Sequence, residues 1–170
     1  MSHAENRVEW CFRKAADETA RGRPHRGLVA QRPDRELARR HLAKAEHNAR
    51  AIISFKKTGF SDWSASAAFY TAYHCFLAIL AKRGYESRNQ ECTFALIARL
   101  IETGELRLDR DVLRRFHALD PDAVAASASV TGLREAEQYG VSLSLEEKAY
   151  ERVLDLARDV LDRTKTIIEE

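Results

Sequence analysis

The sequence predicts an all-α protein, an up-and-down bundle of four to five helices with a short helical N-terminal extension. Three observations support this fold class. Apolar residues recur at a helical period of about 3.6 in several long segments, and no segment alternates with the period of two that a half-buried strand requires. Capping residues and glycines bound most of those segments. We therefore divide the chain into an extension, residues 1–33, and a bundle, residues 34–170.

The extension begins with a predicted helix from Glu5 to about Ala20, followed by a loop over residues 21–33 that contains two prolines and two glycines. Basic residues concentrate in this half of the chain. Residues 1–57 hold 14 Lys and Arg against 7 Asp and Glu, whereas residues 58–170 hold 14 against 19. Arginine suits phosphate recognition because its planar fork makes paired hydrogen bonds. A solvated loop and helix face is the simpler interpretation of this arginine-rich segment.

The second predicted helix runs from a cap at Asp34 to Lys57 and ends at Thr58-Gly59. It is amphipathic, because its apolar residues share one face and its basic residues share the other. The apolar face contains Leu37, Ala38, Leu42, Ala45, Ala49, Ile52 and Ile53.

The third predicted helix, Trp63 to Ala81, opens at Ser61 or Asp62 and stops at Gly84. It is apolar in every direction, so we expect it to be buried on all sides. A partner subunit covering its second face would explain this, and we expect a homodimer through helix 63–81. Its length also approaches that of a membrane span. We do not expect a membrane partner, because several polar groups interrupt the helix.

Three further helices complete the expected bundle. Asn89 caps a helix through about Thr103, and Asp109 caps another through Leu119. The stretch Ser144–Glu147 has the form of a capping box and opens a helix that reaches the C-terminus. That last helix is apolar over half its circumference, so we expect it to lie in a groove between two others.

The cysteines and the N-terminus predict a cytoplasmic protein. Cys11, Cys75 and Cys92 are odd in number and form no C-x-x-C pair, so we expect neither a disulfide nor a zinc site and favour a reducing compartment. No apolar signal segment opens the chain. His41 and His47 lie six residues apart, whereas paired metal ligands on a helix need a spacing of three or four. We expect no metal and no cofactor.

Tyr70 and His74 are two polar residues that lie one turn apart inside the apolar helix. A buried histidine needs hydrogen-bond partners and tends to lose its charge. One interpretation is a neutral histidine bonded to a carbonyl or hydroxyl oxygen. The other is a polar spot that lines a cleft between subunits.

The run DWSASAAFYTAYHCFLAILAKRGYESRNQ resembles the signature helix of HEPN-domain proteins, and LREAEQYG, with Arg134, resembles the second landmark of that family. The final helix, from Leu145, resembles the closing helix of the family. The resemblance covers roughly residues 35–168. It implies a HEPN-like bundle, a homodimer, and a place in prokaryotic toxin–antitoxin or stress systems with a small nucleotidyltransferase as partner.

Active HEPN proteins cut RNA without a metal through an Arg-x(4–6)-His motif, in which histidine moves the 2′-hydroxyl proton and arginine stabilises phosphate charge. This chain departs from the motif, since no histidine follows Arg134 before Val141. The same spacing occurs in three other places, at Arg35 and His41, Arg40 and His47, and Arg110 and His117. Arg134, Arg110 and His117 are therefore weak catalytic candidates.

The sequence thus favours an interaction module over an efficient catalyst. We expect it to bind nucleotide or RNA phosphate, a nucleotidyltransferase, or both. Arg134 would hold phosphate, Tyr139 would stack or hydrogen-bond, and His74 and Tyr70 would line the cleft. A salt bridge from Arg134 to Glu137 is the structural alternative. The functional alternatives are a metal-independent RNase toxin, with Arg134 assisted by His74 or His117, and a purely structural dimeric scaffold.

Overall fold

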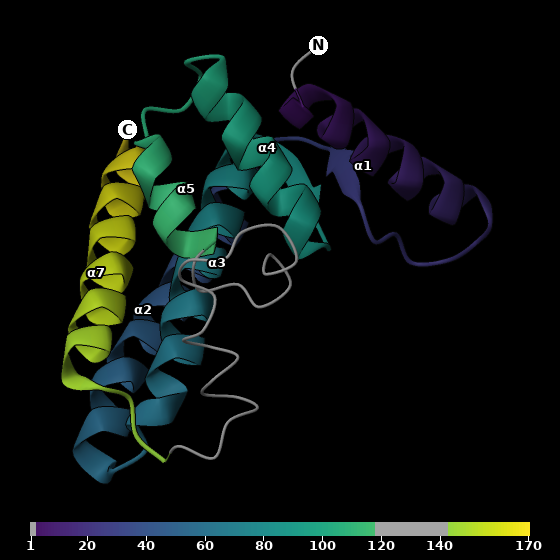
Figure 1. Cartoon of the computed structure of the whole chain (residues 1–170). Coiled ribbons are helices and arrows are strands. Elements are labelled where there is room, and N and C mark those ends of the chain that lie inside the picture. The colour runs from purple at the N-terminus through teal and green to yellow at the C-terminus, as the bar shows by residue number, and fades with distance from the viewer. Residues whose placement is uncertain (1–2, 118–142) are drawn as a thin grey trace.

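The computed structural model describes residues 3–117 and 143–170, and these residues are mainly helical (Figure 1). The predicted all-α class is confirmed. Within the described residues the helices are α1 (His3–Ala20), α2 (Arg35–Thr58), α3 (Ser64–Lys82), α4 (Gln90–Glu102), α5 (Arg110–His117) and α7 (Glu147–Glu169). A single 3₁₀ turn, Ser61–Trp63, precedes α3, and two short strands are β1 (Leu28–Ala30) and β2 (Tyr85–Ser87).

The ends of α2 are those that the sequence predicts. The Asp34 carboxylate accepts a hydrogen bond from the Leu37 N–H at 2.8 Å and satisfies a donor that the first turn leaves free. At the other end Gly59 adopts a left-handed conformation with φ of 85°. Its side-chain-free backbone tolerates this conformation, which closes the helix.

Helix α3 is the centre of the bundle, and α2, α7, α4 and α5 surround it (Figure 1). Fourteen of its 19 residues are buried. By length and composition Ser61–Lys82 could cross a membrane, but most of this segment is buried inside the protein. The expectation that a partner subunit must cover its second face is wrong for most of the helix, because neighbouring helices of the same chain already cover it.

Four phenylalanines pack together between α3, α4 and α5. The Phe116 ring lies 4.9 Å from that of Phe69, 5.2 Å from that of Phe76 and 4.8 Å from that of Phe94, measured between centroids. Aromatic rings at such separations attract one another beyond the area that they bury. This cluster fixes α5 against the central helix.

Helices α2 and α3 form an antiparallel hairpin with a definite register. Near one end the Asp34 N–H donates to the Ala81 carbonyl oxygen at 2.9 Å, and near the turn the Ser64 hydroxyl donates to the Ile52 carbonyl oxygen at 3.2 Å. In each pair, the two residues lie about equally far along the chain from the turn that joins the helices. Residues of the two helices that are equidistant from the turn therefore lie side by side.

A two-stranded antiparallel sheet corrects the prediction that the chain contains no strand. The strand β1 lies within the expected loop over residues 21–33 and pairs with β2 in the register Leu28 with Ser87 and Ala30 with Tyr85. Strands of three residues are too short to show an alternating pattern. Gly84, with φ of 81°, lets the backbone at Gln31 approach β2, since a Cβ there would lie 2.5 Å from the Gln31 carbonyl oxygen.

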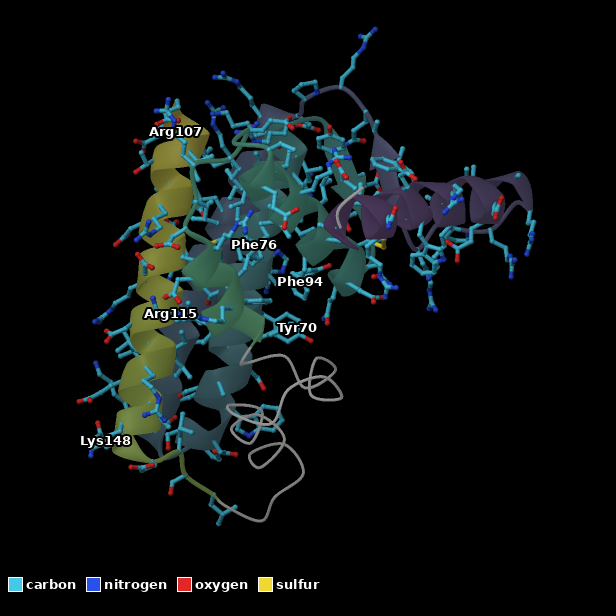
Figure 2. All side chains as sticks on the ribbon, turned by 45° about the horizontal axis from the view of Figure 1, so that its top comes forward. Tyr70, Phe76, Phe94, Arg107, Arg115 and Lys148 are labelled. Atoms are coloured by element: carbon cyan, nitrogen blue, oxygen red, sulfur yellow. A yellow bond between two sulfur atoms is a disulfide. The ribbon has the colours of Figure 1, made fainter. Side chains whose placement is uncertain are left out.

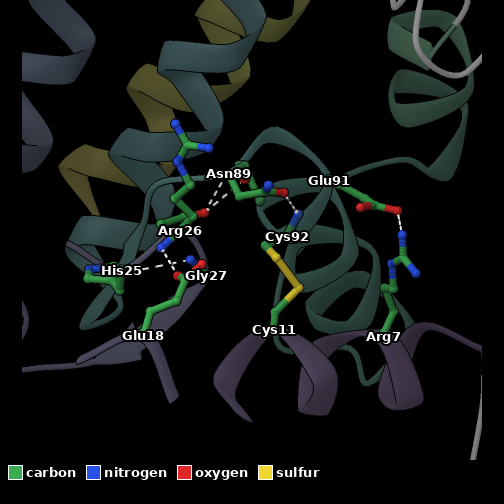
Figure 3. Close-up of a disulfide and its surroundings, with 11 residues drawn as sticks. Arg7, Cys11, Glu18, His25, Arg26, Gly27, Asn89, Glu91 and Cys92 are labelled. Carbon is green, nitrogen blue, oxygen red and sulfur yellow. Dashed lines mark hydrogen bonds and ion pairs between the residues drawn. A yellow bond between two sulfur atoms is a disulfide. The ribbon is translucent and has the colours of Figure 1, made fainter. Parts of the chain in front are cut away.

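A disulfide between Cys11 on α1 and Cys92 on α4 corrects the prediction that the cysteines stay free (Figure 3). The two residues are 81 positions apart, so no spacing rule could reveal the pair. Both are fully buried where α1 packs on α4. An ion pair between Arg7 and Glu91 lies beside the bond. The extension thus folds back onto the bundle, and Figure 1 shows α1 projecting to one side of it.

The starts of the later helices agree only in part with the sequence. The Asn89 side chain accepts from the Cys92 N–H at 3.0 Å, as expected of a cap, and α5 begins directly after Asp109. The capping-box prediction at Ser144 is wrong, because the cap residue of α7 is Glu146 and makes no side-chain capping bond. The Leu145 N–H instead donates to the Ser61 hydroxyl at 3.0 Å, and this bond ties the start of α7 to the 3₁₀ turn.

Candidate functional site

The α2–α3 hairpin brings five polar and aromatic side chains together, which we call the α2–α3 cluster. Arg40 and Lys44 are exposed on α2, one turn apart, with His41 between them. Tyr70 and His74 lie one turn apart on α3. The hairpin register explains the meeting, since His41 and His74 are equidistant from the turn.

The centre of the cluster is a direct contact between two histidines. The Nδ1 atoms of His41 and His74 lie 3.1 Å apart, and the ring centroids lie 5.3 Å apart. Both side chains are half-buried. The predicted hydrogen-bond partner of His74 was a carbonyl or hydroxyl oxygen, and the partner that the structure provides is a second imidazole.

Both histidines are neutral at neutral pH. Burial lowers the pKa of His41, and the charge of Arg40 lowers it further. Burial lowers the pKa of His74 to about 4, and the neighbouring His41 ring and the charge of Lys44 add to this effect. Desolvation and nearby cations both disfavour the imidazolium form. The cluster therefore combines two permanent cations with two neutral rings that can each accept or donate a proton.

Exposed aromatic rings continue the cluster along α3. The side chain of Tyr70 is 42% exposed and that of Trp63, two turns earlier, is 53% exposed. Figure 2 shows Tyr70 extending outward from α3. Between Tyr70 and His74 lies Tyr73, whose pKa is raised by burial, an effect that the Thr93 side chain partly opposes. The Tyr70 and Trp63 rings are thus exposed in a segment whose other side chains are mostly buried.

The predicted site residues have different outcomes. His74 and Tyr70 lie in the α2–α3 cluster, where the structure brings them close to His41. Arg110 is exposed on α5 and pairs with Glu102 of α4 at 3.9 Å, and His117 is the last residue of α5. Arg134 and Tyr139, with the alternative Arg134–Glu137 salt bridge, lie outside the described residues. No set of three potential metal-ligating side chains gathers in residues 3–117 and 143–170.

The sequence interpretation missed Arg40, His41 and Lys44 as members of the site. It judged His41 by its spacing to His47 along one helix and did not consider a partner on another helix. The signal was present in the hairpin itself. With Asp34 opening one helix and Gly84 closing the next, an antiparallel pair places position 41 opposite position 74.

Two comparisons with known proteins bear on this site. A family model described as HEPN domain matches residues 38–167, which cover all or nearly all of each described helix except α1 and contain every member of the α2–α3 cluster. No characterised protein matches the chain significantly in sequence. The match begins beyond Cys11 and β1, so the disulfide joins a segment outside the family region to one inside it.

Proposed function

The chain belongs to the HEPN family, and from this premise we propose that it binds RNA or nucleotide phosphate at the α2–α3 cluster as an interaction module rather than as an efficient catalyst. Membership of the family associates the chain with nucleotide- and RNA-related functions. The observation that carries the proposal is the joining of exposed cations, neutral histidines and exposed aromatic rings on one hairpin.

The cations supply the phosphate-binding part. The charge of Lys44 reaches His74 and that of Arg40 reaches His41, so both act on the same small region. A phosphate placed there would meet two positive charges and a ring N–H group. Arginine and lysine next to neutral hydrogen-bonding groups form a common type of phosphate site. In the same proposal Arg134 adds a further phosphate contact and Tyr139 stacks or hydrogen-bonds beside it.

The aromatic rings favour unpaired bases over a duplex. Trp63 is the cap residue directly before α3 and Tyr70 lies seven residues later on that helix, a rise of about 10 Å along one face. Bases of single-stranded nucleic acid stack on exposed aromatic side chains while cations follow the backbone. A duplex keeps its bases stacked inside and would leave both rings unused. We therefore expect single-stranded RNA to bind more tightly than a mononucleotide or a duplex.

Fluorescence anisotropy with a labelled single-stranded RNA of about 12 nucleotides tests this proposal. We expect saturable binding that weakens with salt, and a smaller salt slope in Arg40→Gln and Lys44→Gln, because each removes a phosphate contact. Lys148→Gln is the matched control. Lys148 is also exposed but lies on α7, well apart from Tyr70 (Figure 2). If all three variants weakened binding equally, the cluster would not be the site, and if no nucleic acid bound, the scaffold alternative would stand.

A metal-independent endoribonuclease is the second candidate, and the His41–His74 contact favours it. Two adjacent neutral imidazoles supply both a proton acceptor and a proton donor, which RNA cleavage by the 2′-hydroxyl requires. The test is cleavage of the same RNA with and without a chelator, repeated with His74→Gln and Arg134→Ala. Cleavage that survives the chelator and disappears in the variants would establish the enzyme. Intact RNA at high protein concentration would remove this candidate.

We propose a homodimer and, in a prokaryotic toxin–antitoxin or stress system, a nucleotidyltransferase partner. The exposed rings of Trp63 and Tyr70 support a dimer contact through part of α3, although most of that helix is covered within one chain. Light scattering of the wild type and of Trp63→Ser tests the dimer. A monomer in both would contradict it.

A cytoplasmic location completes the proposal. The Cys11–Cys92 bond weighs against it, because reducing compartments keep thiols free. Trapping of free thiols in freshly lysed cells tests it, and we expect Cys11 and Cys92 to be labelled if the protein is cytoplasmic and reduced.

A further inference from the structure

The contact between His41 and His74 constrains the tautomers of both rings. Two bare nitrogens would repel at the 3.1 Å between the Nδ1 atoms, so one of them carries the hydrogen. A neutral imidazole holds one proton only. The ring that donates at Nδ1 therefore has a bare Nε2, and the ring that accepts at Nδ1 has its proton on Nε2. The pair as a whole offers one acceptor and one donor at its two Nε2 atoms.

We propose that His41 and His74 work as one coupled acid–base pair, in which His41 sets the tautomer of His74 and the pair takes a ligand with a hydroxyl beside a phosphate oxygen. The choice of ligand rests on the proposed function. The bare Nε2 accepts the hydroxyl hydrogen, and the Nε2–H donates to the phosphate oxygen. Ribose carries such a hydroxyl at its 2′ position and deoxyribose does not.

The surroundings favour this state of the pair over its charged states. Arg40 and Lys44 of α2 act on the rings as cations, and Tyr70 and Tyr73 lie beside His74 on α3. A proton added to the bare Nε2 would leave the Nδ1 contact intact but place a net positive charge close to two further cations. The charges that attract a phosphate thus also keep the pair neutral.

The same geometry supplies a balanced path for one proton. When the hydroxyl proton moves to the bare Nε2, the Nδ1 proton of that ring passes to the Nδ1 of its partner. The partner then releases its Nε2 proton to the phosphate ester oxygen, while the hydroxyl oxygen forms a bond to phosphorus and the bond from phosphorus to that ester oxygen breaks. One proton has crossed the pair, one N–H bond has formed for each that has broken, and the two tautomers have exchanged. In this path His41 and His74 touch the ligand from opposite ends of one hydrogen-bonded unit.

Nitrogen NMR of the histidine-labelled full chain tests the pair without any ligand. Nδ1–H and Nε2–H tautomers have distinct ¹⁵N shifts, and we expect opposite tautomers for the two rings at neutral pH. His41→Leu should let His74 exchange between tautomers, whereas His47→Leu, a matched change on the exposed face of α2, should leave both rings unchanged. His41→Asn is a further variant. Its side-chain amide reaches only the position that the His41 Nδ1 occupies, so it can bond to the His74 Nδ1 and restore one tautomer of His74. The same tautomer in both rings of the natively folded wild type would overturn the proposal.

Binding of matched oligonucleotides tests the ligand. With RNA, DNA and 2′-O-methyl RNA of one sequence, we expect the wild type to prefer RNA by about fivefold or more, the usual effect of one hydrogen bond. His41→Leu should lose this preference and keep the salt dependence. Equal binding of RNA and DNA, with opposite tautomers observed, would overturn the ligand assignment while the proposed phosphate site stands. Failure of all three to bind would instead remove the proposed function, and the ligand assignment with it.

Discussion

The central helix α3 and the N-terminal helix α1 are nearly equal in length but are held in place by different means. Fourteen residues of α3 are buried among the surrounding helices. On α1 the buried side chains of the described residues are Val8, Cys11 and Ala15. One of these three is covalently bonded to α4. Packing positions α3, whereas a narrow apolar strip and a cross-link position α1.

This difference explains why one helix could be interpreted from the sequence and the other only in part. Burial on all sides leaves a pattern that can be read, because every face of the helix must be apolar. A cross-link leaves no periodic pattern. The comparison predicts that damage to α3 unfolds the protein, while damage to α1 releases one element and leaves the rest folded.

The largest expected effect is that of a cavity beside α3. Phe76→Ala removes a fully buried ring that contacts Phe94 and Phe116, and we expect a loss of about 3–5 kcal/mol in the free energy of unfolding. Urea denaturation followed by circular dichroism measures it. Trp63→Ala, directly before the same helix, is the control, since loss of its exposed ring should cost far less. Similar losses in both variants would contradict the central place of α3.

Loss of the cross-link should have the next largest effect, and a local one. Cys11→Ser opens an 81-residue loop, and removal of such bonds typically costs about 2–4 kcal/mol. We expect faster amide exchange over α1 and β1 and faster tryptic cleavage at Arg21, with exchange in α3 unchanged. Cys75→Ala is the control, because Cys75 is a free, buried cysteine whose thiol pKa burial raises to about 12. Equal protection of α1 in the wild type and in Cys11→Ser would show that packing alone holds it.

Acid should weaken the bundle through His74. The folded protein lowers the pKa of this ring from 6.5 to about 4, so the unfolded chain binds the proton more readily. Its contribution to stability is therefore complete above pH 6.5 and is lost as the pH falls toward 4. Because the ring is half-exposed, we expect a loss of about 1 kcal/mol. Thermal melts of the wild type and of His74→Gln between pH 7 and 5 measure the difference, and parallel curves would contradict it.

A smaller effect is expected at the cap that positions the cysteine on α4. Asn89→Ala removes the acceptor for the Cys92 N–H, and such caps contribute about 1 kcal/mol. The measurement is the denaturation midpoint with and without a thiol reductant. If the cap orients Cys92 for its bond, the variant should lose more stability under oxidising than under reducing conditions. The same loss in both would mean that the cap acts on α4 alone.

The smallest effect should come from the ion pair beside the disulfide. Arg7 and Glu91 are about half-exposed, and surface pairs of this kind contribute less than about 1 kcal/mol. We expect Arg7→Gln to lower the melting temperature slightly at low salt and not at all at high salt. A loss that persists at high salt would show that Arg7 packs on α1 through its stem.

The fold was predictable because its elements follow local rules. Asp34, Gly59, Gly84 and Asn89 act as the caps and stops that their types and positions indicate, and α3 is buried as its composition requires. The errors concern contacts between distant segments. The short pairing of β1 with β2 and the disulfide depend on how the extension folds back, which no local pattern records.

The candidate site divides in the same way. His74 and Tyr70 could be named from their place in an apolar helix, but the partner of His74 is 33 positions earlier on α2. Assigning that partner required the register of the hairpin as well as its existence. Arg134 and Tyr139 were inferred from the family resemblance and stay predictions.

The ring that the disulfide closes also determines how the chain would respond to a pulling force. A force applied at the two termini passes from Cys11 directly to Cys92, so β1, α2, α3 and β2 lie outside the loaded path. With the bond intact, about 81 residues, or roughly 280 Å of contour length, would stay hidden from extension. The load would fall first on the few turns of α1 before Cys11 and on the peeling of α7 from the bundle. Reduction would lengthen the extensible chain by that amount and bring the α2–α3 hairpin into the force path.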